Sequence, residues 1–325
     1  MKVFITRVIP SEGLSILQNA GFDVTQWTEK RDLAQRELIA YAKAHDALLS
    51  VGKNQLDAFF FKECRHLKAI TLLSAGYDHV DIGTANEMGI PVGYTPDVLS
   101  NATADTALLL MLAVSRKAFY QHKRIQNGEW QFYDPTAHLG FELTGKTLGI
   151  FGLGRIGMAL ARKCIGAFGM KVIYHNRNRN LQAEKDLNVQ FVSFNELVLQ
   201  SDVLSVHANL SVETREVFNL SVFRKMKPSA IFINTARGGL HNEQELTEAL
   251  KDGLIWGAGL DVTNPEPMAA DNELLNMPNV CILPHIGSAT KEARTAMAVM
   301  AAQNIIEGAK GLEMPHTINP QVYQR

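Results

Sequence analysis

Three glycines, spaced as Gly152-x-Gly154-x-x-Gly157, join an apolar run to a helix-period segment in the stretch TLGIFGLGRIGMALARKC. The first glycine permits a tight turn, the second lets the backbone approach a pyrophosphate, and the third lets the helix pack closely against the strand. The stretch KVIYHN follows as a second strand at the expected distance. Because a strand, this turn, a helix and a second strand form one βαβ unit, the spacing predicts a parallel sheet that binds a dinucleotide at the start of the helix.

Short apolar runs alternate with helix-period segments along most of the chain, which has 325 residues. KVFIT, ALLSV and KAITLLS are such runs near the N-terminus, and VLSVHA, AIFINTA and VCILPH follow further along. Nearly continuous apolar strands that are separated by helices are typical of parallel sheets covered on both faces. The pattern therefore predicts an α/β protein with two doubly wound parallel-sheet domains, a number that the length also favours.

Two long helices interrupt this alternation. The first is expected in NATADTALLLMLAVSRKAFYQHKRIQNGEW, with Asn101 as candidate N-cap, and the second follows HIGSAT, with Ser288 as candidate N-cap and no strand after it. We expect these helices to bracket a Rossmann-type dinucleotide-binding domain, residues 101–286, inserted in a flavodoxin-like substrate-binding domain, residues 1–100 and 287–325. Two sequential domains divided near residue 140 are the alternative.

The charges of the chain nearly cancel, because 32 lysines and arginines stand against 33 acidic residues. Such a chain lacks the global field that attracts nucleic acid or an anionic membrane, so neither is expected as a partner. Cys64, Cys164 and Cys281 are in no metal-ligand spacing and suit a reducing compartment, which predicts no metal and a cytoplasmic location. The longest apolar stretch is well short of a membrane span.

The stretch VIYHNRNRN ends the second strand of the predicted βαβ unit. An acidic residue ordinarily binds the adenosine ribose hydroxyls at this point, and Asn176 stands in its place. Asparagine does not repel a 2′-phosphate, and Arg177 and Arg179 are permanently charged donors suited to binding one. The stretch therefore favours NADPH, with NAD as a second cofactor. Arginines that are simply solvated on a loop are the alternative interpretation.

Four further stretches, SAGYDHVD, KPSAIFINTARG, GLDVTNPEP and LPHIGSATKEAR, extend the pattern over essentially the whole chain. Together with the glycine spacing they resemble the D-2-hydroxyacid dehydrogenase family, and within it the glyoxylate/hydroxypyruvate reductase branch. The resemblance implies an enzyme that reduces small 2-keto acids by hydride transfer from NADPH. Its expected reactions are glyoxylate to glycolate and hydroxypyruvate to D-glycerate, in a cleft that closes between the two domains.

Reduction of a 2-keto acid needs a hydride donor, an acid that protonates the carbonyl oxygen, and a cation that holds the carboxylate. The resemblance assigns the acid to His285, because an imidazolium donates a proton near neutral pH. Glu266 would hydrogen-bond the other ring nitrogen and favour the charged form, and Arg237 would bind the carboxylate and the carbonyl oxygen. By position alone, these residues would be a structural histidine, a loop acid and a helix-end ion pair.

Further substrate contacts are expected where two N-terminal strands end. The resemblance places Ser74, Ala75 and Gly76 at the substrate, with backbone N–H groups that receive its carboxylate. A plain strand-to-helix turn is the alternative interpretation of this segment. Val51 and Gly52, which end another strand, are expected to contact the substrate as well.

Trp130, in NGEWQFYDP, lies in a segment that in relatives reaches into the partner subunit's active site. An aromatic side chain there would restrict the substrate to small acids. Packing within the dimer interface is the alternative for Trp130. Either interpretation implies a homodimer.

The remaining expectations concern the cofactor. The resemblance places Thr103 near the nicotinamide and Asp261 on its carboxamide, although helix capping and turn chemistry would also explain them. VHANLS departs from the His-x-Pro that often follows this strand, and His241 stands where the resemblance predicts an apolar or acidic side chain. The expected cofactor contacts are Thr103, Gly152, Gly154, Arg155, Ile156, Gly157, Asn176, Arg177, Arg179, His207, Ala208, Thr214, Thr235, Ala236, Asp261, Gly287 and Ser288.

Two other functions stay open. One is an NAD-dependent D-2-hydroxyacid dehydrogenase of another substrate, of the phosphoglycerate, lactate or gluconate type, although the arginines of NRNR disfavour NAD. The other is a dinucleotide-sensing protein that resembles the transcriptional corepressors with this fold, which keep the same Arg, Glu and His set. Turnover of glyoxylate would separate such a binding protein from an enzyme.

Overall fold

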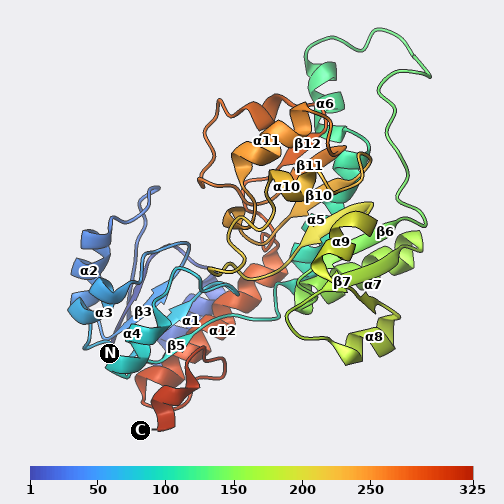
Figure 1. Ribbon diagram of the computed structural model, residues 1–325. Coiled ribbons are helices and arrows are strands. Elements are labelled where there is room, and N and C mark those ends of the chain that lie inside the picture. The colour runs from blue at the N-terminus through green and yellow to red at the C-terminus, as the bar shows by residue number, and fades with distance from the viewer. Residues whose placement is uncertain (325) are drawn as a thin grey trace. The chain divides into compact units, whose positions relative to one another are not determined.

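A computed structural model describes residues 1–324 of the chain. The chain forms two compact units (Figure 1), one made of Met1–Leu99 and the residues from Ser288 onward, the other of Ser100–Gly287. Each unit is built on one parallel sheet. The predicted α/β fold with two parallel-sheet domains is therefore confirmed.

The first unit contains a five-stranded sheet in the order β2-β1-β3-β4-β5. All pairs are parallel, and Ala47 pairs with Val3 on one side and with Ala69 on the other. Every residue of the two central strands β3 and β4 is buried, as expected for strands covered on both faces. The strands are β1 (Lys2–Ile5), β2 (Asp23–Gln26), β3 (Ala47–Ser50), β4 (Ala69–Leu72) and β5 (Val92–Gly93).

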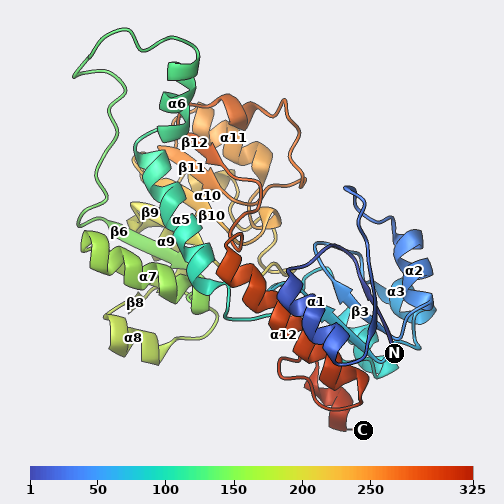
Figure 2. The same cartoon turned by 180° about the vertical axis from the view of Figure 1, so that it is seen from behind.

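Helices α1 (Ser11–Asn19) and α12 (Lys291–Ala309) lie side by side in the first unit (Figure 2), and α12 also contacts β3, β4 and β5. The N-cap of α12 is Thr290, whose hydroxyl accepts the N–H of Ala293 at 3.1 Å. The predicted cap, Ser288, is therefore wrong, and its carbonyl instead accepts the N–H of Thr290. The remaining helices are α2 (Gln35–Lys43), α3 (Ala58–Glu63), α4 (Ile82–Met88) and the 3-10 helix η3 (Pro320–Gln324).

The second unit contains a seven-stranded parallel sheet in the order β12-β11-β10-β9-β6-β7-β8. The order reverses between β6 and β9, because β7 and β8 lie on one side of β6 and the later strands on the other. In such sheets ligands bind outside the carboxyl ends of the strands at this reversal. The strands are β6 (Thr147–Phe151), β7 (Lys171–His175), β8 (Gln190–Phe191), β9 (Val203–Val206), β10 (Ile231–Asn234), β11 (Gly257–Leu260) and β12 (Val280–Ile282).

Two hydrophobic cores form in the second unit. Helices α5 (Ser100–Ser115), α7 (Arg155–Phe168) and α8 (Leu181–Leu187) contribute buried side chains to one core. The other core contains residues of α9 (Phe194–Gln200), α10 (Leu220–Phe223) and α11 (Glu243–Lys251). The unit also contains α6 (Ala118–Gln126) and the 3-10 helices η1 (Gly238–Leu240) and η2 (Glu273–Asn276).

The single long helix that the sequence predicts after residue 100 is two helices, α5 and α6. Between them Lys117 has a φ of 52°, in the left-handed region. The Ser115 carbonyl accepts the N–H of Phe141 at 3.2 Å, and a Cβ at Gly140 would lie 2.1 Å from the same carbonyl oxygen. The helix is thus interrupted where a distant segment packs against it. Asn101 is also not the N-cap, since α5 begins one residue before it.

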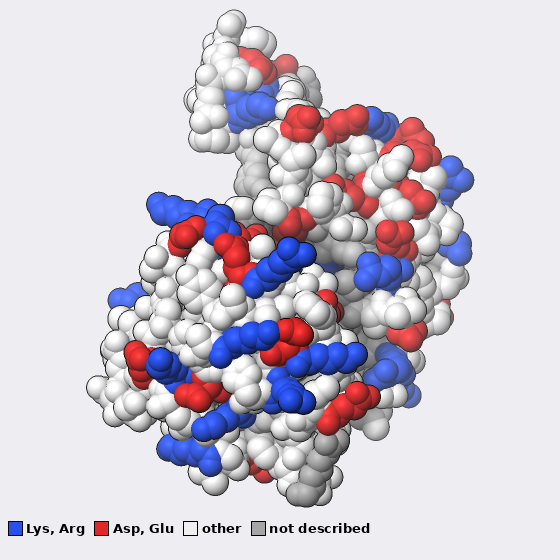
Figure 3. Space-filling model, turned by 90° about the vertical axis from the view of Figure 1, so that its left-hand side faces the viewer, with Lys and Arg blue, Asp and Glu red and all other residues white. Residues whose placement is uncertain are grey.

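Basic and acidic side chains are interspersed on the face drawn in Figure 3. Ion pairs such as Arg31 with Glu37 and Lys43 with Glu63 join surface residues of opposite charge. Paired charges of this kind produce little field beyond roughly 10 Å at moderate salt. Among the helices of residues 1–324, none is long and apolar enough to cross a membrane.

Candidate active site

The glycine-rich turn lies between β6 and α7, beside the reversal in strand order. Gly152 has a φ of 97°, and a Cβ there would lie 2.5 Å from the backbone nitrogen of Ala208. A Cβ at Gly157 would lie 2.8 Å from the carbonyl oxygen of Gly152. Gly154 is the exposed N-cap of α7, and it offers no side chain to cap the helix. The turn therefore directs backbone N–H groups toward an anion. The helix starts with Arg155 and Ile156.

Asn176 ties the end of β7 to the glycine-rich turn. Its side-chain oxygen accepts the N–H of Leu153 at 2.6 Å, and its amide nitrogen lies 3.4 Å from the Leu153 carbonyl oxygen. An uncharged side chain thus holds the turn at the position where an acidic residue would bind the ribose.

Arg179 forms a two-pronged ion pair with Glu184. Its Nε and Nη2 atoms lie 3.1 and 2.5 Å from the two carboxylate oxygens, and its guanidinium lies 5.8 Å from the ring centroid of Phe191. Glu184 also accepts a hydrogen bond from the Tyr174 hydroxyl at 2.6 Å. The positive charge of Arg179 is therefore balanced by a carboxylate of helix α8.

Arg177 is exposed and faces the loop that follows β9. The pKa of Glu213 in that loop is lowered, chiefly by the Ser211 hydroxyl and in smaller part by the charge of Arg177. Thr214 closes the loop, because its hydroxyl accepts the N–H of Ser211 at 2.8 Å and donates to the Asn209 carbonyl at 2.8 Å. The two arginines of the NRNR stretch thus have different surroundings.

His207 follows β9 and lies against the glycine-rich turn. Its Nε2 lies 2.8 Å from the Ser205 hydroxyl, and its carbonyl carbon would lie 2.8 Å from a Cβ at Gly152. Burial lowers the pKa of His207 to about 4, so the ring is neutral near neutral pH. The predicted cofactor contacts of His207 and Ala208 stay predictions, and the structure shows a packing role for both.

Arg237 follows β10 in a short segment that leads into η1. Its Nη1 donates to the Ala236 carbonyl at 2.8 Å, and its side chain is half-buried. The next residue, Gly238, packs so closely that a Cβ there would lie 2.0 Å from the Thr263 carbonyl oxygen. Thr235 is buried, and its hydroxyl has no hydrogen-bond partner among residues 1–324. The segment that carries Arg237 is therefore closely packed along its backbone.

His285 and Glu266 come from different loops and form a hydrogen bond. The Nδ1 atom of His285 lies 2.6 Å from Oε1 of Glu266. The His285 side chain is 40% exposed and that of Glu266 is 21% exposed, so a small molecule in solution can reach the imidazole. Nδ1 is occupied by this contact, which leaves Nε2 for a second partner.

Asp261 holds the turn that carries His285. It directly follows β11, and its two carboxylate oxygens accept the N–H groups of Ile286 at 2.7 Å and Gly287 at 2.8 Å. His285 has a φ of 53°, a conformation that residues other than glycine rarely adopt. Burial raises the pKa of the Asp261 carboxyl. This backbone role was not predicted from the sequence, because it depends on the pairing of β11 with β12, which brings the two strand ends together.

Thr103, near the start of α5, lies against the same turn. Its hydroxyl donates to the Gly287 carbonyl at 3.2 Å. A Cβ at Gly287 would lie 2.9 Å from Oδ2 of Asp261 and 3.2 Å from Cγ2 of Thr103. The structure thus brings these three predicted residues together. Ser288 is the first residue of the C-terminal part of the other unit.

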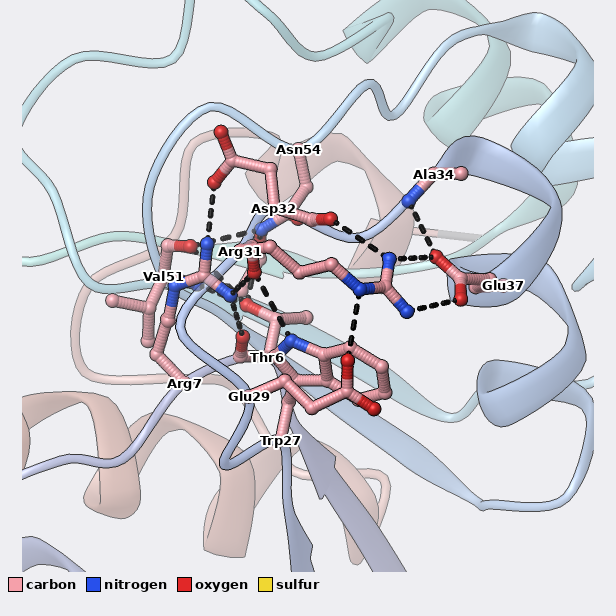
Figure 4. Close-up of polar contacts among 11 residues, drawn as sticks. Thr6, Arg7, Trp27, Glu29, Arg31, Asp32, Ala34, Glu37, Val51 and Asn54 are labelled. Atoms are coloured by element: carbon pink, nitrogen blue, oxygen red, sulfur yellow. Dashed lines mark hydrogen bonds and ion pairs between the residues drawn. The ribbon is translucent and has the colours of Figure 1, made fainter.

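Val51 and Gly52 follow β3 in the first unit. Thr6 accepts the N–H of Val51 at 2.8 Å through its hydroxyl, and Asn54 donates to the Val51 carbonyl at 2.9 Å (Figure 4). Asn54 also donates to the Thr6 hydroxyl at 3.0 Å. Thr6 and Asn54 are not among the residues predicted from the sequence. The signal that could have found them is the polar Thr6 at the end of one apolar run and Asn54 three residues after the end of another.

The Ser74–Gly76 turn follows β4, which is adjacent and parallel to β3. The Ser74 hydroxyl donates to the Gly76 carbonyl at 2.7 Å, and Ala75 between them is half-buried. Because the carboxyl ends of neighbouring parallel strands meet at one edge of a sheet, this turn and the one after β3 share an edge. Their role in substrate binding stays a prediction.

Trp130 lies in the segment between α6 and β6, which projects from the second unit (Figures 1 and 2). It is 67% exposed, and the neighbouring Phe132 and Tyr133 are 74% and 85% exposed. These aromatic side chains are presented outward rather than packed in the core of the unit.

Residues 1–324 contain no group of three or more His, Cys, Asp or Glu side chains arranged to hold a metal ion. Cys64, Cys164 and Cys281 are buried as free thiols. Burial raises their pKa values to about 11, 12 and 11, respectively, which leaves them protonated and unreactive.

Comparison with known proteins places the chain in a family. The model of the "D-isomer specific 2-hydroxyacid dehydrogenase, NAD binding domain" matches residues 108–287. A glyoxylate reductase of Pyrococcus furiosus is 41% identical over 325 residues, which cover 99% of this chain and 96% of the relative. The glyoxylate reductase/hydroxypyruvate reductase of Homo sapiens is 40% identical over 322 residues, which cover 97% of each chain.

A solved structure agrees with these matches. The NADPH-dependent glyoxylate/hydroxypyruvate reductase of Sinorhizobium meliloti, in complex with NADP and malonate, superposes with a TM-score of 0.86. It is 29% identical, and the alignment covers 100% of this chain and 98% of the other. The family that the sequence resembles is therefore confirmed, and with it the class of oxidoreductases. The chain belongs to the D-isomer specific 2-hydroxyacid dehydrogenases.

Proposed function

We propose that this chain reduces small 2-keto acids, glyoxylate to glycolate and hydroxypyruvate to D-glycerate, with NADPH as the preferred cofactor. The observation that carries the proposal is the 2.6 Å hydrogen bond between His285 and Glu266, in the unit that contains the glycine-rich turn. The names of the relatives that cover nearly the whole chain support this substrate class.

The second unit fits a nicotinamide dinucleotide. The start of α7 has no side-chain cap, and two buried polar atoms lie at the ends of β9 and β10 without a hydrogen-bond partner in residues 1–324. They are Nδ1 of His207 and the hydroxyl of Thr235. Unpaired buried polar atoms at the carboxyl ends of strands, together with an uncapped helix start in the same unit, are what a bound dinucleotide would satisfy. The cofactor supplies the hydride when it is bound.

His285 would supply the proton. A carboxylate only accepts hydrogen bonds, so the contact with Glu266 requires a proton on Nδ1 and fixes the ring with Nε2 on its other side. The Nε2 proton then passes to the keto oxygen as negative charge develops there, and it becomes the hydroxyl proton of the product.

Arg237 would hold the substrate. Its guanidinium is planar and permanently charged, so it can bind the carboxylate and the keto oxygen of a 2-keto acid at the same time. A cation beside the keto oxygen also stabilises the charge that develops during hydride transfer. The close packing of Gly238 against Thr263 supports this role, because it limits the movement of the segment.

Arg177 would bind the 2′-phosphate of NADPH, with Arg179 as a weaker contributor. The unequal roles follow from the ion pair that Arg179 makes with Glu184. Asn176 adds no negative charge that would oppose the phosphate. The relative from Sinorhizobium meliloti, whose structure contains NADP, supports this choice of cofactor.

Use of NAD is the second candidate, and the Arg179–Glu184 ion pair is the observation that favours it. If Glu184 balances one of the two arginines, the loop holds less net positive charge for a phosphate. The chain would then be an NAD-dependent dehydrogenase of the same family with another 2-hydroxy acid as substrate.

Steady-state kinetics of glyoxylate and hydroxypyruvate, each with NADPH and with NADH, test the proposal. We expect kcat/KM for glyoxylate and for hydroxypyruvate to be about ten-fold or more higher with NADPH than with NADH, which corresponds to about 1.4 kcal/mol. Equal use of NADH would contradict the cofactor preference. Absence of turnover with both acids would contradict the substrate class, and it would leave a dehydrogenase of another 2-hydroxy acid or a dinucleotide-sensing protein.

We also propose a homodimer formed by the second unit. Apolar side chains are exposed on α5 and α6 and continue into the segment with Trp130, where a monomer would leave them in water. Size-exclusion chromatography with light scattering should give about twice the 35.9 kDa mass of one chain. A mass of one chain would contradict the proposal. These side chains are Leu109, Leu112, Phe119, Ile125, Trp130, Phe132 and Tyr133.

A cytoplasmic location is part of the same proposal. The three free, buried cysteines suit a compartment in which thiols stay reduced. Fractionation of the source cells with an antibody against the chain would test it, and recovery outside the cytoplasmic fraction would contradict it.

A further inference from the structure

His241 is fully buried behind the segment that carries Arg237. It directly follows η1, and its ring centroid lies 5.8 Å from that of Phe232 in β10. The Nδ1 atom lies 3.0 Å from Nδ2 of Asn234, the last residue of β10. Nε2 is buried and has no hydrogen-bond partner in residues 1–324. Burial of an imidazole with one polar contact is costly, so packing alone does not favour histidine at this position.

Asn234 connects this histidine to Arg237. Its amide nitrogen donates to the Arg237 carbonyl at 2.8 Å, and its amide oxygen accepts the N–H of Ala236 at 3.0 Å. Both contacts are with the backbone, where donor and acceptor are fixed, so they determine which amide atom is nitrogen and which is oxygen. The second N–H of the amide then points at Nδ1 of His241.

The amide of Asn234 in turn determines where His241 carries its proton. Its nitrogen only donates, so Nδ1 of His241 must accept and carries no proton, and the neutral ring has its proton on Nε2. Burial lowers the pKa of His241 to about 4, so the neutral ring persists at physiological pH. An apolar side chain at this position would leave one N–H of Asn234 buried without an acceptor, which is costly.

We propose that His241 is a positioning residue for Arg237. Through Asn234 it fixes the backbone of residues 235–237. It thereby fixes the position from which the Arg237 side chain, which binds the 2-keto acid, extends. The inference rests on the proposed function, because the role exists only if Arg237 binds the substrate.

Two variants of similar polarity distinguish the positioning of Arg237 from a role of His241 in packing alone. In His241→Asn, the side-chain oxygen takes the place of Nδ1 and still accepts from Asn234. In His241→Gln, it takes the place of Nε2, away from that amide. We expect His241→Gln to lower kcat/KM for glyoxylate by about 10- to 100-fold, mostly through a higher KM, because small displacements of a binding group have effects of this size. His241→Asn should retain most of the wild-type value.

The KM for NADPH and the thermal stability of each variant serve as controls. In both variants the KM for NADPH should change less than the KM for glyoxylate, because most of the proposed cofactor contacts, the glycine-rich turn and Arg177 among them, lie outside residues 235–237. Thermal unfolding identifies a variant that has lost its fold. His241→Leu, which removes the acceptor without adding a polar atom, should resemble His241→Gln in its KM for glyoxylate.

A double-variant cycle tests whether the effect passes through Arg237. In an Arg237→Ala background, His241→Gln should cause no further loss of kcat/KM, because the guanidinium that it positions is absent. Losses that multiply in the double variant would overturn the proposed role.

The remaining outcomes distinguish this inference from the proposed function. If the wild type reduces glyoxylate and the Asn and Gln variants are equally active, the positioning role is overturned and the proposed function stands. If the wild type reduces neither glyoxylate nor hydroxypyruvate, both are overturned. Nitrogen NMR of the His241 imidazole in the wild-type chain needs no variant. It should show an unprotonated Nδ1 and a protonated Nε2, and the opposite tautomer would overturn the inference.

Discussion

The turn that carries His285 and the loop that carries Arg177 and Arg179 differ in what holds them. The buried carboxylate of Asp261 binds two backbone N–H groups of the turn at 2.7 and 2.8 Å. The arginines are exposed, and the ion pair of Arg179 with Glu184 lies at the surface, with the Arg179 side chain 56% exposed. Breaking a buried contact is costly, whereas an exposed ion pair contributes only about 0–1 kcal/mol. We therefore expect proton transfer to depend on the rigidly held turn of His285. We expect the cofactor preference to depend on the exposed charges of Arg177 and Arg179.

The largest effect is expected at His285. His285→Gln retains a group that can hydrogen-bond to Glu266 but removes the proton donor. The value of kcat/KM for glyoxylate with NADPH should fall by about 10²- to 10⁴-fold, the usual contribution of a general acid. Fluorescence titration should give an unchanged Kd for NADPH. A variant that keeps most of its activity would remove His285 from the chemistry.

A smaller loss is expected when the support of the turn is changed. The carboxylate of Asp261 accepts hydrogen bonds from two backbone N–H groups. In Asp261→Asn, the amide NH₂ group replaces one of the two oxygens and cannot accept, so one backbone N–H group loses its partner. We expect kcat/KM to fall by about 10- to 100-fold, because a buried donor without a partner costs about 1–3 kcal/mol. The Tm should fall as well. Asp271→Asn makes the same change at an exposed residue ten positions further along the chain; it is the matched control and should change neither value.

The loop arginines should affect discrimination between cofactors rather than the chemistry. Arg177→Ala should lower the preference for NADPH over NADH by about ten-fold, or about 1.4 kcal/mol. Arg179→Ala should lower it less, because Glu184 already balances its charge. The ratio of kcat/KM values for the two cofactors measures both effects. Equal losses in the two variants would show that the ion pair does not weaken Arg179.

The smallest effect is expected at Glu184. Glu184→Gln removes the carboxylate that pairs with Arg179 and frees this positive charge for the phosphate. The preference for NADPH should rise by about two- to three-fold, within the range of an exposed ion pair. The same kinetic ratio measures it. A preference that falls or stays constant would indicate that Arg179 does not reach the phosphate.

Local sequence patterns predicted much of the fold and part of the site. The glycine spacing indicated the turn at Gly152 because its requirement is local: a positive φ and a close approach to the next strand. The alternation of apolar runs and helices indicated both parallel sheets, since periodicity follows directly from burial on two faces. The helix ends were less accurate, because Ser288 and Asn101 are good N-cap residues that the structure does not use as caps.

Contacts between distant segments account for the rest. The break between α5 and α6 depends on Gly140, which packs on the Ser115 carbonyl from 25 positions further along the chain. The link from His241 through Asn234 to Arg237 requires the turn after β10 to be folded. The Arg179–Glu184 ion pair spans only five residues, and its spacing at the start of α8 was a signal that the sequence analysis did not use.

The pH dependence of kcat/KM for glyoxylate with NADPH, measured for the wild type and for His285→Gln, tests the central claim most directly. A general acid is active when protonated, so the wild-type value should fall as pH rises. The residual activity of His285→Gln should lack this fall. If the variant shows the same decline as the wild type, another group donates the proton and the proposed mechanism is wrong.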